Sequence, residues 1–438
     1  MNDAVLAGLL TDKYELTMLA AALRDGTAQR RTTFELFARR LPEGRRYGVV
    51  AGTGRLLEAL PRFRFDDEAC QLLAEFLDAD TLRYLRDFRF DGDIDGYAEG
   101  ELYFPGSPVL SVSGSFAECV VIETLALSIF NHDSAIASAA ARMVSAAGER
   151  PLMDMGTRRT HERAAVAAAR AAYIAGFGAT SNLEAQRQYG IPTEGTAAHA
   201  FTMLHTLKDG PSEIGELAAF RAQVDALGTD TTLLVDTYDV TTGVANAVAA
   251  GGATLGAVRI DSGELGVLAR QVREQLDGLG ATQTRIVVSG DLDEFSIAAL
   301  RADPVDSYGV GTSLVTGSGA PAAGMVYKLV DVDGLPVQKR SSHKESVGGR
   351  KEAVRLSRPT GTITEEVVHR AGRAPAPTEP CRVLTTPLVR GGQVVAETGN
   401  AALLAARQLV ASGLRSLPWE GLSLAHGDPA IPTTQIPA

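Results

Sequence analysis

Two loops rich in glycine and hydroxyl side chains are candidate phosphate sites. Residues 311–321, GTSLVTGSGAP, follow an apolar run, and their glycines, their amides and the hydroxyls of Thr312 and Ser313 are suited to cradling a phosphate group. Clusters of Gly, Ser and Thr are more often plain turns, so this loop alone is a weak signal. A second loop of the same kind, SGD at 289–291, precedes it by one strand–helix unit. Two such neighbouring loops are typical of sugar-phosphate sites and favour that interpretation.

Acidic residues follow three of the predicted strands. Carboxylates in such positions accept hydrogen bonds from ribose hydroxyls or hold Mg²⁺ together with phosphate oxygens. The competing interpretation is helix N-capping, which is at least as good for Asp239 and Asp291. Asp261 lies two residues after Arg259 in RIDSG, and this pairing favours a functional role. The four acidic residues are Asp236, Asp239, Asp261 and Asp291.

Three arginines stand at predicted strand ends: Arg158, Arg159 and Arg259. The planar guanidinium group matches the geometry of both carboxylates and phosphates. A surface role is the default for any single arginine. Two of them at barrel-strand ends of an acidic chain favour an anionic small substrate, without showing which anion each arginine meets.

His199 lies just past a Gly-Thr loop, in GTAAH. A neutral imidazole here is able to act as a nucleophile toward a phosphoryl donor or as a proton shuttle, although a structural hydrogen bond is the commoner role of a single histidine. The chain has no HExxH or CxxC spacing, which argues against a transition-metal site.

The elements that position these residues are repeated strand–helix units. Short apolar runs alternate with helical stretches in the middle of the chain, the pattern of a parallel sheet. Polar loops at the carboxyl ends of such strands converge on one site, so the arrangement favours an enzyme. Six units in roughly 170 residues favour a barrel over an open sheet. The predicted strands are 151–155, 193–196, 231–235, 254–260, 284–288 and 306–310.

The flanks of this barrel follow other patterns. A strand is predicted at 32–38, and helices at 116–131 and 134–147. Strands at 325–332, 351–357 and 363–369 are separated by turns rather than helices. We therefore predict four parts: an N-terminal α/β domain (1–125), a barrel with the active site (126–324), an antiparallel segment that packs back on the N-terminal domain (325–416) and a loosely ordered Pro-rich tail (417–438).

Composition and charge narrow the class of protein. The 438 residues carry a formal net charge of -11, which argues against a nucleic-acid or anionic-membrane partner. Three widely spaced cysteines fit a reducing cytoplasm rather than a disulfide scaffold. The N-terminus lacks the pattern of a signal peptide, and the most apolar stretch, 119–130, is interrupted by Glu123 and too short to span a bilayer. We expect a cytoplasmic protein without a membrane partner.

Seven motifs, taken in their order and spacing, resemble the nicotinate phosphoribosyltransferase family. The resemblance runs from about residue 9 to about residue 388, and the combination is highly specific although each piece alone is not. The motifs are LLTDKYELTM (9–18), TTFELFARRLP (32–42), DMGTRRTH (154–161), GTAAHAF (195–201), VRIDSGEL (258–265), GVGTSLVT (309–316) and VYKLV (326–330).

This resemblance implies a type II phosphoribosyltransferase fold, an irregular α/β barrel beside an N-terminal α/β sandwich, in a homodimer with shared active sites. The implied reaction converts nicotinate, phosphoribosyl pyrophosphate, ATP and water to nicotinate mononucleotide, pyrophosphate, ADP and phosphate, the first step of NAD salvage from nicotinate. Mg²⁺ is the implied cofactor and ATP a co-substrate of this ligase. The family phosphorylates a histidine transiently, and His199 matches that histidine.

The resemblance also implies roles for single residues. His199, Asp261 and Arg259 would be the catalytic residues. One departure is Ala200, which follows His199 where the family pattern carries serine, and this puts the efficiency of ATP coupling in doubt. Nicotinate would be bound by Tyr14 of the partner subunit, stacked on the pyridine ring, and by Arg158, Ser181, Thr196 and Arg259. Phosphoribosyl pyrophosphate would be bound by Asp261, Ser289, Gly290, Asp291, Gly311, Thr312 and Ser313, with Asp261 and Asp291 as candidate Mg²⁺ ligands.

Three alternatives stay open at this point. A phosphoribosyltransferase for quinolinate would need a more basic pocket, and one for nicotinamide would place an acidic residue where Ser181 stands. A sugar-phosphate lyase or isomerase would need a Schiff-base lysine or an acid–base pair, and none stands out. A nucleotide-responsive binding protein with a degraded site is disfavoured, because the Arg, Asp and His residues and the Gly-Thr loops are intact.

Overall fold

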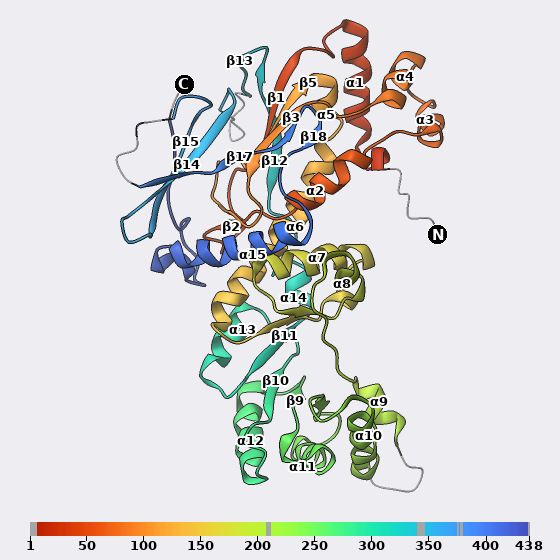
Figure 1. The fold of residues 1–438 in the computed structure, drawn as a ribbon, viewed down its shortest axis with the longest axis vertical. Coiled ribbons are helices and arrows are strands. Elements are labelled where there is room, and N and C mark those ends of the chain that lie inside the picture. Colours follow the sequence, from red (N-terminus) through yellow and green to blue (C-terminus); the bar gives the residue numbers. More distant parts are fainter. Residues whose placement is uncertain (1–6, 207–211, 340–346, 375, 377–379, 437–438) are drawn as a thin grey trace. The chain divides into compact units, whose positions relative to one another are not determined.

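The computed structural model describes residues 7–206, 212–339, 347–374, 376 and 380–436 and contains two compact units (Figure 1). The central unit comprises residues 139–319. The flanking unit comprises residues 1–138 and 320–438. The N-terminal part and the segment after residue 320 thus share one unit, and the strand–helix repeats form the other.

The central unit is built on a six-stranded parallel sheet, as the alternating pattern predicts. Its strand order is β7-β6-β11-β10-β9-β8. The first strand, β6, therefore lies beside the last, β11, and the sheet curls on itself. The strands are β6 (Leu152–Asp154), β7 (Ala179–Thr180), β8 (Thr232–Leu234), β9 (Ala257–Ile260), β10 (Arg285–Val288) and β11 (Ser307–Val310).

Helices connect these strands. Helices α10, α11 and α12 follow one another around the sheet (Figure 1). Helix α7 buries a row of alanines, whose small side chains permit close packing. The helices are α7 (Glu162–Ala175), α8 (Leu183–Tyr189), α9 (His199–Leu204), α10 (Ser212–Leu227), α11 (Val240–Gly251), α12 (Leu265–Gly278), α13 (Glu294–Ala299) and α14 (Thr312–Val315), with the 3-10 turns η3 (Thr157–Arg159), η4 (Gly252–Thr254) and η5 (Leu300–Ala302).

One predicted strand of this unit is wrong. Residues 193–196 form only a single parallel bridge, between Thr193 and Thr180, and the strand that pairs with β6 is β7. The segment 193–196 has no apolar side chain to bury, whereas the two residues of β7 are too few to produce an alternating pattern. The other five predicted strands are confirmed.

The flanking unit contains a seven-stranded sheet in which neighbouring strands are antiparallel. The predicted strand at 32–38 is confirmed as β1, which lies between β5 and β12 with Leu36 opposite Tyr327. Strand β12 of the C-terminal segment therefore pairs with β1 of the N-terminal part. In spatial order the strands are β13 (Leu335–Pro336), β12 (Met325–Val332), β1 (Arg31–Ala38), β5 (Leu110–Ser115), β3 (Asp93–Tyr97), β17 (Thr385–Arg390) and β18 (Gln393–Val394).

A second sheet of this unit corrects the prediction of a loosely ordered tail. Its strands are β16 (Cys381–Val383), β14 (Lys351–Ser357), β15 (Ile363–Arg370) and β19 (Thr433–Gln435). Strand β19 lies in the predicted tail and pairs in parallel with β15, and Ile431 just before it is buried. Backbone pairing and this apolar anchor order the chain end, although its proline content suggested otherwise.

Helix α15 (Gly399–Ser416) lies in the segment predicted as antiparallel strands, and it was missed. It buries Leu403, Ala406, Val410 and Leu414, a helical spacing. The remaining elements of the unit are η1 (Ala7–Leu9), α1 (Lys13–Asp25), β2 (Gly48–Val49), α2 (Thr53–Ala59), η2 (Leu60–Arg62), α3 (Asp67–Leu73), α4 (Ala79–Asp87), β4 (Leu102–Tyr103), α5 (Phe116–Val120) and η6 (Trp419–Leu422).

Helix α6 (Glu123–Ala147) replaces the two helices predicted at 116–131 and 134–147. The break lies before Glu123, and the polar pair His132 and Asp133 is accommodated inside the helix by an ion pair of Asp133 with Arg55. By length and composition the stretch 116–147 would suffice to cross a membrane, but most of it is buried in the fold, as expected for a core helix.

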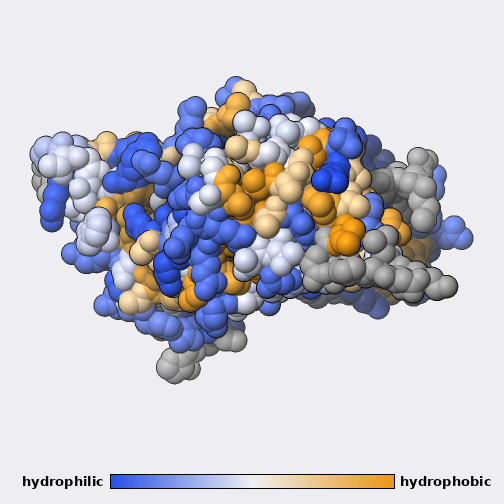
Figure 2. Space-filling model, turned by 90° about the horizontal axis from the view of Figure 1, so that it is seen from below, coloured by the Kyte–Doolittle hydropathy of each residue, from blue (hydrophilic) through white to orange (hydrophobic). Residues whose placement is uncertain are grey.

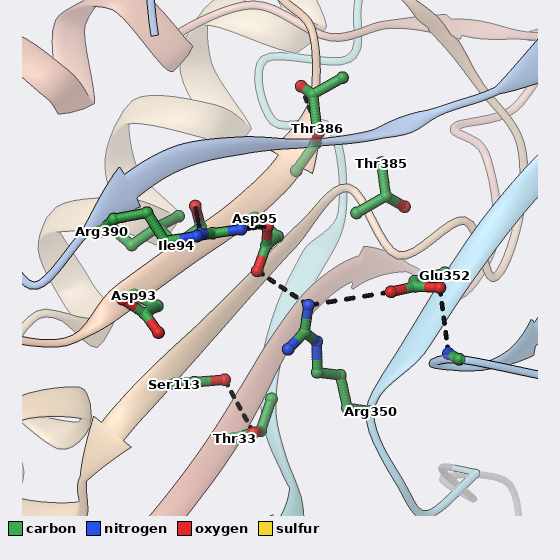
Figure 3. Close-up of polar contacts among 12 residues, drawn as sticks. Thr33, Asp93, Ile94, Asp95, Ser113, Arg350, Glu352, Thr385, Thr386 and Arg390 are labelled. Atoms are coloured by element: carbon green, nitrogen blue, oxygen red, sulfur yellow. Dashed lines mark hydrogen bonds and ion pairs between the residues drawn. The ribbon is translucent and has the colours of Figure 1, made fainter. Parts of the chain in front are cut away.

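Ion pairs join the C-terminal strands to the large sheet (Figure 3). Asp95 on β3 accepts a hydrogen bond from Nη2 of Arg350 at 2.9 Å and pairs on its other oxygen with Arg390 of β17. Nearby, the hydroxyls of Thr33 and Ser113 lie 2.9 Å apart across β1 and β5. Arg350 and Arg390 each lie more than 250 positions from Asp95 in the sequence, and only the folded register brings them together.

The surface of the molecule is mixed. On the face in Figure 2, apolar residues gather in patches among hydrophilic ones. Exposed large apolar side chains in the central unit include Leu183, Leu204 and Leu227. Scattered exposure of this kind is ordinary for a folded protein and marks no site by itself.

Glu15 is a fully buried carboxyl group between α1 and the start of α6. Its Oε1 accepts a hydrogen bond from the Thr124 amide at 3.0 Å, and the hydroxyls of Thr11 and Thr124 also donate to it. Burial raises the pKa of Glu15 from 4.5 to about 7, although the two threonines oppose the shift. Between about pH 4.5 and about pH 7 the folded protein therefore keeps a proton on Glu15 that the unfolded chain loses.

We expect Glu15→Gln to remove a pH dependence of stability. Between about pH 4.5 and about pH 7 the folded state binds more protons than the unfolded state, so stability falls as pH rises through this window. The free energy of unfolding of Glu15→Gln, relative to wild type, should rise by about 3 kcal/mol from pH 4.5 to pH 8. Urea denaturation at several pH values measures this difference.

Glu58→Gln is the matched control, because Glu58 on α2 is exposed and its substitution should leave stability close to that of wild type. A Glu15→Gln variant whose stability difference from wild type stays constant across the window would contradict the raised pKa.

Candidate active site

Arg259 on β9 is the centre of a polar cluster at the carboxyl ends of the central strands. Its Nε donates to the Ser289 hydroxyl at 2.8 Å, its Nη1 to the Thr196 hydroxyl at 3.2 Å and its Nη2 to Oδ1 of Asp261 at 2.7 Å. These residues follow β9, β10 and the bridge at Thr193. One guanidinium group thus joins three of the loops that were predicted to converge.

The spacing of Arg259 and Asp261 explains why they meet. Side chains two residues apart along a strand point to the same face, here the inside of the curled sheet. Ser289 follows β10 at the equivalent level and also donates to Asp261. Burial opposes ionisation of Asp261, but the hydrogen bonds of Ser289 and Arg259 and the nearby His199 outweigh it and lower its pKa. Asp261 is therefore an ionised carboxylate at neutral pH.

Gly290 lies where no side chain fits. A Cβ atom there would stand 2.2 Å from the backbone oxygen of Asp261, and its φ of +99° favours glycine. Asp291 also has a positive φ, of 38°. It does not cap the next helix, because Asp293 is the N-cap of α13, so the capping interpretation of Asp291 is wrong. Asp239, by contrast, does cap α11.

Asp236 at the end of β8 supports the cluster from behind. Its Oδ2 accepts hydrogen bonds from the Asp261 amide at 2.8 Å and the Ser262 hydroxyl at 2.7 Å. Its Oδ1 is buried without a partner among the described residues. The sequence identifies Asp236 as one of the acidic residues at strand ends, but it does not predict the contact with Asp261, because that partner follows the neighbouring strand.

His199 is the first residue of α9. Its Nδ1 lies 3.1 Å from the hydroxyl of Thr237, which follows β8. Nε2 has no hydrogen-bond partner in the part of the chain that the structure describes. The ring is thus held through one nitrogen, and the other is available to a reactant.

The ends of β6 and β7 are joined by Asp154. This buried carboxylate accepts hydrogen bonds from the Gly156 amide at 2.8 Å and the Thr180 hydroxyl at 2.7 Å, and burial raises its pKa. The adjoining loops meet where Thr157 and Ser181 face each other at 3.3 Å. Arg158 lies beside Thr157 but is exposed and makes no polar contact with the Arg259 cluster among the described residues.

The loop after β11 begins the short helix α14. Gly311 is the N-cap residue, and Thr312 and Ser313 form the first turn, so their amides have no partners within the helix. Unpaired amides and hydroxyls of this kind are suited to an anion. Gly311 approaches the β6 loop, since a Cβ atom there would stand 3.6 Å from the backbone oxygen of Met155.

A cavity of about 480 Å³ lies inside the curled sheet below this cluster. Thr196 and Arg259 line the cavity near the carboxyl ends of the strands, and Asp230, Arg285 and Ser307 line it at the amino ends. The volume lies in the range of pockets for small organic ligands.

Tyr14 lies on α1 of the flanking unit. Its ring is about half exposed, and its hydroxyl forms a hydrogen bond with Glu123. Burial and this carboxylate raise the pKa of Tyr14 well above its usual value, so it remains a neutral phenol.

The residues present fit a magnesium ion that is shared with a substrate. Within the described residues no group of three or more His, Cys, Asp or Glu side chains forms a protein-only metal site. Mg²⁺ commonly takes only one or two carboxylates and fills its other positions with phosphate oxygens and water. Oδ2 of Asp261 and the carboxylate of Asp291 have no partners in the described part of the chain, so both remain available.

Comparisons with known proteins agree along almost the whole chain. Residues 9–131 match the family described as nicotinate phosphoribosyltransferase (NAPRTase) N-terminal domain, and residues 151–360 match the nicotinate phosphoribosyltransferase (NAPRTase) family. The chain is 81% identical over 432 residues to nicotinate phosphoribosyltransferase pncB1 of Mycobacterium tuberculosis (strain ATCC 25618 / H37Rv), covering 99% of this chain and 96% of the relative.

Two crystal structures resemble the fold closely. Human nicotinic acid phosphoribosyltransferase gives a TM-score of 0.82 at 27% identity and covers 97% of each chain. Nicotinate-nucleotide pyrophosphorylase from Pyrococcus furiosus gives a TM-score of 0.76 at 25% identity, covering 95% of this chain and 97% of that one. Both likenesses extend through the flanking and the central elements.

Proposed function

The chain belongs to the nicotinate phosphoribosyltransferase family, and from this premise we propose that it makes nicotinate mononucleotide from nicotinate and phosphoribosyl pyrophosphate in an ATP-coupled reaction. The observation that carries the proposal is the cluster in which Arg259 joins Thr196, Ser289 and Asp261 above a cavity of about 480 Å³. In this cluster Arg259 offers a positive charge to the nicotinate carboxylate, and the ionised Asp261 offers a carboxylate to the ribose or to Mg²⁺.

Arg259 is the proposed partner of the nicotinate carboxylate. A guanidinium group has five N–H donors, and three hydrogen bonds to protein groups leave two for a ligand. The fixed orientation suits a planar carboxylate. Thr196 and Ser181 would line the pyridine pocket, and the exposed Arg158 would approach the carboxylate only when substrate is bound.

Phosphoribosyl pyrophosphate is proposed to lie across the loops after β9, β10 and β11. Asp261 and Asp291 would meet the ribose hydroxyls or Mg²⁺, with Ser289 and Gly290 beside them. Gly311, Thr312 and Ser313 would hold the 5'-phosphate through the amides at the start of α14. Mg²⁺, when bound there, would neutralise charge on the pyrophosphate leaving group.

The chemistry needs no protein nucleophile at the ribose. As the bond from C1 to pyrophosphate breaks, positive charge develops on the ribose ring, and the pyridine nitrogen forms the new bond from the opposite face. Arg259 orients the pyridine, and the ionised Asp261 lies where it can stabilise positive charge. Positioning and charge placement would therefore supply most of the rate enhancement.

ATP coupling is proposed to run through His199. Nε2 would accept the terminal phosphoryl group of ATP, releasing ADP, and water would later release phosphate from the histidine. Thr237 holds Nδ1 and so presents Nε2 to the reactant. A phosphoryl group next to Asp261 would rearrange the cluster and tighten substrate binding.

A homodimer with shared active sites is proposed from the exposed side chains near α1. Tyr14 and Met18 lie four residues apart on one face of α1 and are 45% and 37% exposed, and Leu10, which is 51% exposed, lies in the turn before the helix. Large apolar side chains at one helical face favour a protein interface. Tyr14 of a second copy would then stack on the pyridine ring. Cys70, Cys119 and Cys381 are all free thiols, which suits the proposed cytoplasmic location.

The test is product formation with and without ATP. Purified protein with nicotinate, phosphoribosyl pyrophosphate and Mg²⁺ should form nicotinate mononucleotide, and ATP should stimulate it. We expect His199→Ala to abolish the stimulation by ATP, because the phosphoryl acceptor is lost. Nicotinate mononucleotide is followed by chromatography.

His205→Ala is the matched control, since His205 is the C-cap residue of the same helix and its ring forms a hydrogen bond only with the Phe201 carbonyl among the described residues. It should keep the response to ATP. Product from quinolinate or nicotinamide but not from nicotinate would show that the substrate is a different pyridine. No product from any of the three would refute the proposed transferase activity. Full ATP stimulation in His199→Ala would refute the phosphohistidine step alone.

A further inference from the structure

We propose that Ser318 and Glu294 are positioning residues for phosphoribosyl pyrophosphate. Contacts from Ser318 through Glu294 to Arg142 fix the proposed phosphate loop after β11 to α13, the helix that follows the SGD loop. The inference rests on the proposed function, which places the 5'-phosphate at residues 311–313. None of the three residues carries a role in the reaction described above.

Glu294 links the two loops directly. It is the first residue of α13, three positions after Asp291 of the SGD loop, and is 2% exposed. Its Oε2 accepts a hydrogen bond from the Ser318 hydroxyl at 2.5 Å, and its Oε1 accepts one from Nε of Arg142 at 3.0 Å. The guanidinium group of Arg142 also lies over the ring of Phe295, 5.8 Å from its centroid. The loop after β11 is thereby tied to the loop after β10.

Ser318 is held at both its backbone and its side chain. Its amide donates to the Ser313 carbonyl at 2.6 Å, so the turn 316–319 folds back on α14. Ser313 is one of the proposed phosphate ligands. Ser318 thus connects residues 311–313, the proposed phosphate cradle, to the buried carboxylate of Glu294 on α13.

The backbone of Ser318 indicates that the hydroxyl matters. Its φ of +50° lies in the left-handed region, which serine adopts at a cost and glycine adopts freely. Both neighbours, Gly317 and Gly319, are glycines with positive φ. A serine between them accepts strain that a third glycine would avoid, and the hydroxyl contact to Glu294 offsets that strain.

The expected consequence is pre-organisation of the phosphate cradle. An anion-binding loop whose amides are already aimed binds phosphate without first being ordered. Arg142 and Glu294 are both buried, so their pair keeps one geometry instead of exchanging with water. Release of Ser318 would let residues 311–319 move while Arg259 and the nicotinate pocket keep their contacts.

The test compares KM for phosphoribosyl pyrophosphate with KM for nicotinate. We expect Ser318→Ala to raise KM for phosphoribosyl pyrophosphate roughly tenfold, as expected for loss of a hydrogen bond to a charged group, with KM for nicotinate changed less than twofold. Ser318→Gly should give a similar rise, because it removes the hydroxyl although it relieves the backbone. Steady-state kinetics with the second substrate saturating gives both constants.

Ser296→Ala provides the matched control. It removes the capping contact of the same helix without touching Ser318, so it should lower thermal stability and leave both KM values unchanged. A rise in KM for phosphoribosyl pyrophosphate with Ser318→Ala but not with Ser318→Gly would assign the effect to the backbone and overturn the inference. Equal rises in both KM values would also overturn it.

Direct binding keeps this inference apart from the proposed function. Titration calorimetry with phosphoribosyl pyrophosphate and Mg²⁺ should show the same roughly tenfold weakening in Ser318→Ala. Wild-type protein that binds phosphoribosyl pyrophosphate but makes no product would contradict the proposed reaction and leave the calorimetric comparison valid. Unchanged binding in Ser318→Ala, or no binding by wild type, would overturn the positioning role.

Discussion

Arg259→Lys is expected to lower kcat/KM for nicotinate by roughly 10²- to 10³-fold, the largest effect of any single substitution in the cluster. Lysine keeps the charge but has one nitrogen on a flexible stem, so it cannot reach the Ser289 hydroxyl, the Thr196 hydroxyl and Asp261 together. The substitution would loosen three loops at once and remove the planar partner of the substrate carboxylate. Initial rates at varied nicotinate concentrations measure the loss.

Arg285→Lys serves as the matched control for this substitution. Arg285 lines the same cavity from the neighbouring strand β10, but it is exposed and lies at the opposite end of the sheet. We expect its kcat/KM to stay within about threefold of wild type, as for other exposed positions. A loss below tenfold in a folded Arg259→Lys protein would mean that another group receives the carboxylate.

Much of the central unit could be predicted because its strands repeat one chemistry. Apolar runs that end in Asp, Arg, Ser or Gly identify parallel strands whose loops share an edge. The type II phosphoribosyltransferase fold inferred from the motifs is confirmed by the family match and the likeness to the human structure. Strand β7 was missed because two residues carry no periodicity, and the order of the strands depends on how the sheet curls.

Some contacts of the candidate site could be predicted from the spacing of residues in the sequence, and others could not. Arg259 and Asp261 are two apart on one strand, so their meeting follows from the pleat alone. The contact of His199 with Thr237 and that of Asp236 with Asp261 each join separate strands or helices, and no spacing along the chain reveals them. Ser318 looked like any serine of a glycine-rich turn until its φ and its carboxylate partner were known.

A buried charge network in the flanking unit was invisible in the sequence for the same reason. Arg355 on β14 is 3% exposed, and its Nη1 donates to Glu101 at 2.6 Å, while its Nη2 pairs with Glu366 on β15 and donates to the Leu102 carbonyl at 2.9 Å. Glu366 also accepts a hydrogen bond from the Tyr97 hydroxyl at 2.7 Å. Two buried carboxylates thus face one buried cation.

Arg355→Met should lower the free energy of unfolding by about 3–5 kcal/mol, since a buried ion network that loses one partner keeps uncompensated charge. Methionine fills similar volume, so the loss reports charge more than packing. Urea denaturation followed by circular dichroism measures the change. Arg350→Met is the matched control: Arg350 is partly exposed and Asp95 retains Arg390, so we expect a loss of about 1 kcal/mol or less.

Acidification provides the decisive comparison for Arg355. Burial opposes ionisation of Glu101, but the positive charges of Arg355 and Arg382 outweigh burial and lower the pKa of Glu101. The ionised Glu101 therefore stabilises the fold above the ordinary pKa of glutamate, and this stabilisation is lost as pH falls through the folded-state pKa. In Arg355→Met the same carboxylates face each other with less compensation and gain from protonation. The stability gap between wild type and Arg355→Met should therefore narrow as pH falls, whereas a gap caused by packing alone would stay constant.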